Sequence, residues 1–275
     1  MLKAQAEAPS CLKWSMTPCN ICGTESHAFG KARVLRKYDA AFFRCPRCGY
    51  IHTPEPFWLE EAYALDQSTD VGMVSRNVMC ARIAKAVLGV FFDGRGRFLD
   101  FGGGPGLFVR LMRDNGFDFY WQDAFSKNLF AGGFAGNMNS KYEAITVFEV
   151  FEHLTGPVAS VAEMFNVLES ILFSTAIVPA VDCQLGRWWY YAPDQGQHVS
   201  FYTFESLRIL SSAFGARLYT DGNSFHLMTR RRIAPLGFLF SLLSKPRLAA
   251  LVDIGWRRQS LTMDDYARAL GDLGR

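Results

Sequence analysis

The stretch Asp100–Gly106 (DFGGGPG) constrains the fold of this chain more than any other segment. A strand-like run, Arg97–Phe101, leads into the glycines, and a helix-like run, Leu107–Asn115, follows them and is closed by a further glycine. Strand, glycine turn and helix in this order present backbone N–H groups and a helix N-terminus to a ligand. Gly102 and Gly104 can adopt backbone angles that a Cβ forbids, so a ligand can lie against the main chain there.

A second strand and an acidic residue follow at a meaningful distance. The run Phe117–Gln122 reads as a strand that ends at Asp123, which lies 19 residues beyond Gly104. At this spacing a carboxylate at the end of the second strand can accept both hydroxyls of a ribose. The alternatives are another nucleotide site of Rossmann type and a glycine turn with a purely structural role.

The glycine spacing carries a resemblance to a known family. The pattern Asp100-x-Gly102-x-Gly104-x-Gly106 differs from the G-x-G-x-x-G of nicotinamide enzymes and resembles motif I of the class I S-adenosylmethionine (SAM) methyltransferases. The resemblance implies that the glycine turn holds the amino-acid part of SAM and that Asp123 holds its ribose. Residues expected to line the cofactor site are Asp100, Gly102, Gly104, Gly106, Asp123 and Glu149.

Strands and helices alternate through the middle of the chain. Strands are expected over 142–148 and 170–178, helices over 155–169 and 203–214, and a closing antiparallel pair over 216–220 and 224–230. Alternation of this kind is typical of a parallel sheet covered on both faces. We therefore expect an α/β fold with a Rossmann-like, seven-stranded class I methyltransferase sheet. The segment 125–141 is short for a full helix and strand, and it offers Asn137 and Asn139 where the family often places an acid for the adenine.

Two C-x-x-C-G knuckles precede this domain. Cys19 and Cys22 form the first, Cys45 and Cys48 form the second, and 22 residues lie between them. Each knuckle lets two thiolates of one tight turn point at one ion, so the pair can bind a tetrahedral Zn²⁺. The pattern resembles a zinc ribbon with strands between the knuckles, and the metal should supply much of its folding energy. The alternatives are a redox dithiol and unligated cysteines.

The remaining boundaries follow from breaks in the pattern. A helix over 69–92 is expected just upstream of the glycine turn, where Asp70, Arg76 and Asn77 face either ligand or solvent. A basic C-terminal tail with two helices, 237–244 and 247–256, is expected to pack on the domain or form a dimer contact. The alternative is contact with a membrane surface or an acidic partner. The expected organisation is a flexible lead-in (1–18), a zinc ribbon (19–56), a helical linker or lid (57–96), a SAM-binding methyltransferase domain (97–232) and a helical tail (233–275).

Candidate chemistry lies after the expected strand 142–148, because ligands bind at the carboxyl ends of such strands. The sequence there contains Glu149, Glu152 and His153, and a later aromatic loop contains Tyr191 and His198. The two pieces resemble a methyltransferase subfamily with E-V-x-E-H and a later Gln-His, which includes ubiquinone-type O-methyltransferases and ribbon-bearing sugar methyltransferases. The expected catalytic residues are His198 as general base, His153 as the second choice, Glu152 and Tyr191.

A divalent metal is a second possibility at these residues. Small-RNA and ubiquinone-type O-methyltransferases bind one with an E-x-x-E-H cluster, and Glu149, Glu152, His153 and His198 match that pattern. Mg²⁺ or Mn²⁺ bound there could lower the pKa of an acceptor hydroxyl. The structural alternative is that Glu149 and His153 only orient the loop and cap the following helix.

Composition sets broad limits on partners and location. The chain has 275 residues, of which 49% are hydrophobic, and a net charge of +3, which is too small to argue for nucleic acid or a membrane by itself. Seven cysteines fit reduced thiols and a metal better than a disulfide framework. No signal peptide or run of roughly 20 apolar residues is recognised, so a cytoplasmic protein is expected.

These observations lead to one expectation and two rivals. We expect a cytoplasmic SAM-dependent methyltransferase that acts on a small molecule or saccharide, such as a nucleotide-linked sugar or a glycan precursor. The first rival is an RNA methyltransferase whose ribbon grips RNA through Lys31, Arg33, Arg36 and Lys37. The second rival is a non-catalytic zinc-ribbon interaction protein.

Overall fold

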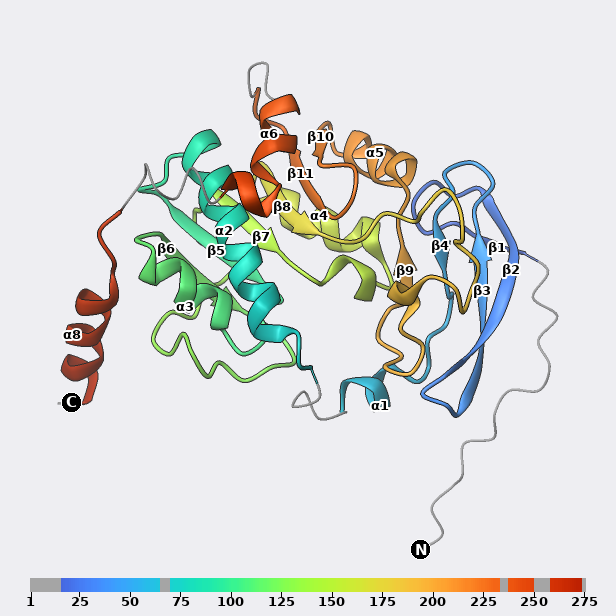
Figure 1. The fold of residues 1–275 in the computed structure, drawn as a ribbon, viewed down its shortest axis with the longest axis horizontal. Coiled ribbons are helices and arrows are strands. Elements are labelled where there is room, and N and C mark those ends of the chain that lie inside the picture. The colour runs from blue at the N-terminus through green and yellow to red at the C-terminus, as the bar shows by residue number, and fades with distance from the viewer. Residues whose placement is uncertain (1–15, 65–69, 233–236, 250–257, 274–275) are drawn as a thin grey trace, which may run out of the picture.

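The computed structural model describes residues 16–64, 70–232, 237–249 and 258–273. Its centre is a six-stranded sheet in the order β10-β11-β8-β7-β5-β6 (Figure 1). Strands β6, β5, β7 and β8 run parallel, whereas β11 is antiparallel to β8 and β10 is antiparallel to β11. The strands are β5 (Arg97–Phe101), β6 (Asp118–Gln122), β7 (Ala144–Val147), β8 (Ser170–Ser174), β10 (Arg217–Thr220) and β11 (Phe225–Thr229).

Six strands are described in this sheet where seven were expected. The seventh position, beside β6, is held by a single parallel bridge between Trp121 and Ala135. The residues between β6 and β7 are too few to form both a crossover helix and a full strand, and two glycines lie beside Ala135. The α/β class and the closing antiparallel pair are confirmed.

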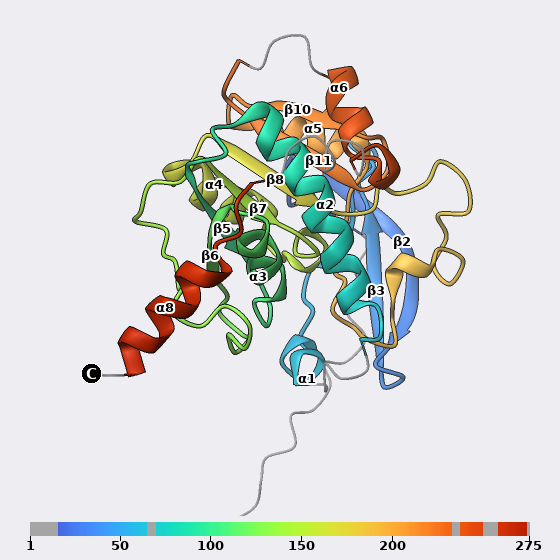
Figure 2. The ribbon, with the colours of Figure 1, turned by 60° about the vertical axis from the view of Figure 1, so that its left-hand side comes forward.

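Helices cover both faces of the sheet (Figures 1 and 2). Alternate residues of each strand enter different cores, so Phe98 packs on the side of α2, α3 and α6, and Leu99 packs on the side of α4 and α5. This alternation explains the nearly continuous apolar character of β7 and β8, which are buried on both faces. The helices are α2 (Met73–Phe91), α3 (Leu107–Asp114), α4 (Pro157–Val167), α5 (Phe204–Ala213) and α6 (Gly237–Leu243).

A second sheet contains the N-terminal segment and one strand from the main domain. Its order is β1-β2-β3-β4-β9, with all neighbours antiparallel. The first four strands come from residues 16–52, whereas β9 comes from the loop that joins β8 to α5. The strands are β1 (Met16–Pro18), β2 (Glu25–Val34), β3 (Tyr38–Arg44), β4 (Ile51–His52) and β9 (Ser200–Phe201).

Three short elements and a terminal helix complete the described chain. Helix α1 (Leu59–Tyr63) lies between the two sheets, and the 3-10 turns η2 (Phe151–His153) and η3 (Trp189–Tyr191) lie in loops at the carboxyl edge of the main sheet. Helix α8 (Thr262–Leu273) projects from the body beside α3 (Figure 2).

The C-terminal segment differs from the expectation. A helix over 237–244 is present as α6, whereas most of the expected helix 247–256 lies outside the described residues, as does the expected lead-in up to residue 15. Helix α8 was not predicted, and its apolar side chains Met263, Tyr266 and Leu270 are each more than half exposed. It is held by charge: Asp265 is bound by Arg113 at 2.7 Å and by Arg110 at 2.8 Å. No described helix is long and apolar enough to cross a membrane.

Candidate functional site

The glycine turn connects β5 to α3 at the carboxyl edge of the main sheet. Gly102, Gly104 and Gly106 all have positive φ, at 69°, 52° and 86°, which is a region that L side chains rarely occupy. A Cβ on Gly102 would come within 2.5 Å of Val150, whereas a Cβ on Gly104 would meet nothing within 4 Å. Gly102 is therefore packed against Val150, whereas the space beside Gly104 is open.

Asp123 holds the turn from the end of the neighbouring strand. Its Oδ2 accepts the Gly104 N–H at 2.8 Å, and its Oδ1 accepts the N–H groups of Phe125 and Ser126 at 2.7 and 2.8 Å. A carboxylate offers about four acceptor positions. Three are used here, so a ribose bound to Asp123 would take the remaining position and displace the Gly104 N–H to gain a second.

Asp100 is buried beneath the turn. It is 3% exposed, and its Oδ1 accepts a hydrogen bond from the Thr146 hydroxyl at 2.6 Å. Burial raises the pKa of Asp100 to about 7, against the opposing effect of that hydrogen bond. Asp100 lies directly beneath the glycine turn, because a Cβ on Gly103 would come within 2.7 Å of its Oδ2. We call residues 97–126 the glycine-turn half of the site.

Glu149 begins the segment that leaves β7, with φ at 56°. Its Oε1 accepts a hydrogen bond from the Ser174 hydroxyl at 2.7 Å, and its Oε2 lies 3.7 Å from Nε of Arg76. Arg76 comes from the first turns of α2 and also pairs with Asp70. The first turns of α2 therefore reach the carboxyl edge of the sheet beside Glu149.

Three residues of the expected catalytic group meet in space. Glu152, His153 and His198 each offer one ligand atom, and these atoms all lie within 4.8 Å of one another. The two imidazole rings are 5.1 Å apart at nearly right angles. Glu149 is not part of this group, because its carboxylate turns toward Ser174 and Arg76. We call Glu152, His153, His198 and the loop 188–203 the histidine half of the site.

Burial sets the charge of these three groups. Glu152 is fully buried, neither of its carboxylate oxygens has a hydrogen-bond partner of normal geometry, and its pKa is raised to about 8 by burial and then by the charge of Glu149. Burial lowers the pKa of His153 to about 3 and that of His198 to about 4. Both imidazoles are therefore neutral at pH 7, beside a carboxyl group without strong partners.

Hydrogen bonds fix how the two imidazoles can act. The Nδ1–H of His198 donates to the carbonyl of Tyr190 at 2.6 Å, so its Nε2 carries the lone pair. The Tyr63 hydroxyl lies 3.4 Å from Nδ1 of His153. A neutral Nε2 on His198 can accept a proton or bind a metal ion.

The structure separates Tyr191 from this group, contrary to the expectation that it is catalytic. Tyr191 is buried against the ribbon strands, and its hydroxyl donates to the carbonyl of Cys183 at 2.6 Å. Tyr190 lies closer to the group: its ring is 4.7 Å from that of His198, and its hydroxyl and that of Thr175 lie beside Glu152. In a 3-10 turn, adjacent tyrosines point to different sides, and the sequence alone does not say which side faces the site.

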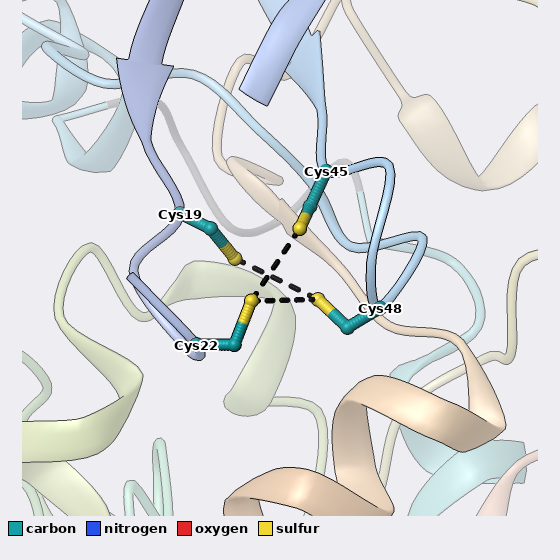
Figure 3. A group of neighbouring side chains, drawn as sticks. All are labelled: Cys19, Cys22, Cys45 and Cys48. Atoms are coloured by element: carbon teal, nitrogen blue, oxygen red, sulfur yellow. Dashed lines mark hydrogen bonds between the residues drawn. The ribbon is translucent and has the colours of Figure 1, made fainter. Parts of the chain in front are cut away.

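The four cysteines of the knuckles form a separate group (Figure 3). Sulfur–sulfur distances are 3.6 Å for Cys19–Cys48, 3.4 Å for Cys22–Cys45 and 3.8 Å for Cys22–Cys48. Four thiolates at a Zn–S distance of about 2.3 Å from one tetrahedral ion would be about 3.8 Å apart. Geometry and donor type therefore fit zinc.

The backbone of both knuckles explains the glycines of the motif. Gly23 and Gly49 each have φ at 71°, and their N–H groups donate to the carbonyls of Cys19 and Cys45. The same turn is thus built twice, once before β2 and once after β3. This repetition is what brings the two pairs of thiols face to face.

Comparison with known proteins identifies the family. The model of the family described as "Methyltransferase domain" matches residues 75–220, which is more than half of the chain. No curated protein sequence matches the chain. The matched range runs from α2 to β10 and contains the glycine turn, Asp123, Glu152, His153 and His198.

Several solved structures share features of this fold at low identity. CalO1, a methyltransferase in calicheamicin biosynthesis solved with SAH, is 15% identical with a TM-score of 0.43, covering 64% of this chain and 60% of its own. Magnesium protoporphyrin IX methyltransferase from Synechocystis, with bound SAH, is 14% identical with a TM-score of 0.44, covering 63% and 93%. The chain thus spans about 60% of the length of CalO1. The family model, which matches more than half of the chain, shows that the chain belongs to the methyltransferase domain family.

Proposed function

We propose that this protein transfers the methyl group of SAM to a small-molecule acceptor across the carboxyl edge of the main sheet. One observation carries the proposal. The glycine turn and Asp123 follow β5 and β6, and Glu152 and His153 follow the neighbouring parallel strand β7. His198 reaches Glu152 and His153 from the loop between β8 and β9. Cofactor and acceptor bound at these two places would meet in line at the sulfonium methyl.

The glycine-turn half is the proposed cofactor site. The amino-acid part of SAM would lie over Gly104, where the backbone has open space, with Gly102 and Gly106 allowing the turn. Asp123 would accept a ribose hydroxyl, and Asp100 would hold the turn from below. Arg76, which pairs with Asp70 and Glu149, would exchange one of these partners for the carboxylate end of the cofactor.

His198 is the proposed general base. A hydroxyl acceptor must lose its proton as it attacks the methyl group, and the free Nε2 of His198 can take that proton while Nδ1–H remains bonded to Tyr190. His153 is the alternative base, since its ring lies 5.1 Å away. A general base typically contributes ~10²–10⁴-fold to rate, so its loss should leave residual activity.

A bound divalent metal is the second candidate for this half. The specific observation is the buried carboxylate of Glu152, which lacks a normal partner and faces two neutral imidazoles. Two imidazoles and one carboxylate suit Mn²⁺ better than Mg²⁺, which prefers an all-oxygen environment. Such an ion would lower the pKa of an acceptor hydroxyl, and Glu152, His153 and His198 would hold it.

The charges on the ribbon favour a small-molecule acceptor over RNA. Two of the four ribbon cations are already paired: Arg36 with Asp194 at 3.0 Å and Lys37 with Glu61 at 2.9 Å. Neutralised cations attract phosphates less strongly. A saccharide acceptor, such as a nucleotide-linked sugar, remains the more specific proposal, and it rests on the resemblance to ribbon-bearing sugar methyltransferases.

The test of the cofactor site is calorimetric titration of SAH into the wild type, Gly104→Ala and Gly222→Ala. Both glycines have positive φ, 52° and 79°, and a Cβ on either meets nothing within 4 Å, so both variants carry a similar backbone strain. Only Gly104→Ala places a methyl group where the cofactor would lie. We expect its SAH affinity to fall at least tenfold while Gly222→Ala binds like the wild type. Absence of SAH binding by the wild type would sink the proposal.

To test for a metal at Glu152, His153 and His198, Mn²⁺ binding is monitored by electron paramagnetic resonance. Glu152→Gln should abolish the bound signal, whereas Glu163→Gln, on the exposed face of α4, should preserve it. A wild-type protein that binds no Mn²⁺ in the presence of SAH would leave His198 as a general base without metal.

A further inference from the structure

The loop that carries His198 is part of the ribbon sheet. Strand β9 pairs with β4, with Phe201 opposite Ile51 and Ser200 opposite His52. Strand β4 begins three residues after Cys48, and β9 begins two residues after His198. Two residue groups far apart in sequence, the second cysteine knuckle and the histidine loop, are thus neighbours in one ladder.

A chain of buried hydroxyls extends this ladder to the catalytic turn η2. Ser200 Oγ donates to the carbonyl of Leu154 at 2.5 Å, and since its single proton is used there, the Tyr50 hydroxyl donates to Ser200 Oγ at 2.5 Å. Tyr50 is fully buried and lies two residues after Cys48. Leu154 directly follows His153, so this chain links the knuckle to the residue beside a catalytic imidazole.

Backbone hydrogen bonds tie the same segments together. The N–H of Val199 donates to the carbonyl of Glu152 at 2.8 Å, and the N–H of Thr53 donates to the carbonyl of Val199 at 3.1 Å. At the other end of β9, the Thr203 hydroxyl donates to the carbonyl of Cys48 at 2.5 Å. Glu152 and His198 are therefore held by residues whose other partners belong to the ribbon.

We propose that the cysteine ribbon is a positioning element of the methyl-transfer site, acting through the hydrogen-bonded chain Tyr50–Ser200–Leu154. This inference rests on the proposed function for its catalytic meaning. Zinc at the four cysteines fixes the second knuckle, the knuckle fixes Tyr50 and β4, and these fix the loop that carries His198. Ser200 is the positioning residue, because its hydroxyl joins Tyr50 of the ribbon to Leu154, the residue that follows η2.

The test compares the zinc-loaded full chain with Ser200→Ala and with Ser211→Ala. Ser211 is an equally buried serine whose hydroxyl donates to the carbonyl of Ala216 at 2.9 Å, away from the ribbon. Amide hydrogen exchange is measured over 151–154 and 196–203. Loss of two hydrogen bonds in Ser200→Ala should speed exchange there roughly tenfold, whereas Ser211→Ala should not change it. Tyr50→Phe serves as a second variant, which removes only the outer link.

A spectroscopic signature separates positioning from general destabilisation. The Nδ1–H of His198 donates to Tyr190, and the Nε2–H of His226 donates to the carbonyl of Thr175 at 2.9 Å, so both protons should give protected resonances in histidine-labelled protein. Ser200→Ala and zinc removal by a chelator should each broaden or remove the His198 signal and leave that of His226 intact. Retention of the His198 signal with unchanged exchange would overturn the inference.

SAH titration of the same samples separates this inference from the proposed function. None of the hydrogen bonds that join β9 to the ribbon and to η2 involves the glycine turn. SAH should therefore bind Ser200→Ala with wild-type affinity. If the wild type itself fails to bind SAH, the proposed function is lost, and the exchange and imidazole signals still decide whether the ribbon positions the loop. A loss of SAH affinity confined to Ser200→Ala would contradict a role restricted to the histidine half.

Discussion

The glycine-turn half and the histidine half of the site are built in different ways. Residues 97–126 form the first half as one continuous segment of strand, turn, helix and strand, held by the short-range bond between Gly104 and Asp123. The second half depends on segments near residues 50, 152 and 198, which meet through β9 and the Ser200 hydroxyl. A substitution elsewhere in the chain should leave the geometry of a local motif unchanged. A site assembled from distant segments changes when any one of those segments is altered.

The largest expected effect is loss of the ribbon when its metal is removed. A ribbon of this size has a small core, and structural zinc contributes about 10–16 kcal/mol to such folds. Cys45→Ser should therefore release the bound zinc and make residues 16–52 sensitive to protease, while SAH still binds the glycine-turn half. The matched control is Cys80→Ser, which alters a buried cysteine of α2 outside the knuckles. Metal analysis and limited proteolysis provide the measurements.

Loss of SAH binding in Cys45→Ser, with the zinc gone and the main sheet still folded by circular dichroism, would break the comparison. It would mean that the glycine-turn half also depends on the ribbon. Full retention of zinc by the variant would instead contradict the assignment of Cys45 as a ligand.

The second effect is a pH dependence of stability that comes from Asp100, a buried residue of the glycine-turn half. Its pKa in the folded state is about 7, above its ordinary value of 3.8. The folded protein therefore keeps a proton that the unfolded chain releases, so this contribution to stability is full below about pH 4 and is lost as pH rises through 7. The loss is on the order of 4 kcal/mol at most, since one pKa unit corresponds to about 1.4 kcal/mol.

Asp100→Asn should remove this pH dependence, because its amide oxygen can still accept the Thr146 hydroxyl and carries no charge. Urea unfolding at pH 5 and pH 8 provides the measurement, with the exposed Asp182→Asn as control. The wild type should lose stability between the two values, and Asp100→Asn should lose less. An equal loss in both proteins would place the pH dependence elsewhere.

The same contrast explains what the sequence predicts well. Gly102, Gly104 and Asp123 lie within one short segment, and their spacing predicts both the turn and the strand that follows it. The bond between Gly104 and Asp123 can therefore be expected from the local sequence alone. The cysteine knuckles are similar, because each builds the same glycine-supported turn locally. Prediction fails where partners are distant. Pairing of β9 with β4, the burial of Tyr191 against the ribbon strands and the docking of α8 through Asp265 all depend on contacts that no local pattern records.

The smallest expected effect is the coupling energy between Tyr63 and Phe125, which lie where the two halves approach each other. Tyr63 of α1 stacks on Phe125 with ring centroids 5.3 Å apart and planes 3° apart, while its hydroxyl faces His153 at 3.4 Å. Phe125 belongs to the turn capped by Asp123, so Tyr63 links the glycine-turn half to His153 of the histidine half.

A double-mutant cycle measures that contact. Tyr63→Leu, Phe125→Leu and the double variant should give a coupling of about 0.5–1 kcal/mol in urea unfolding, because an aromatic pair contributes about that much and Phe125 is 81% exposed. If the halves communicate through this pair, saturation with SAH should increase the coupling, since the cofactor would fix the turn that carries Phe125. A coupling near zero in both conditions would mean that the two halves fold and bind independently, and the ribbon would then act on the acceptor side alone.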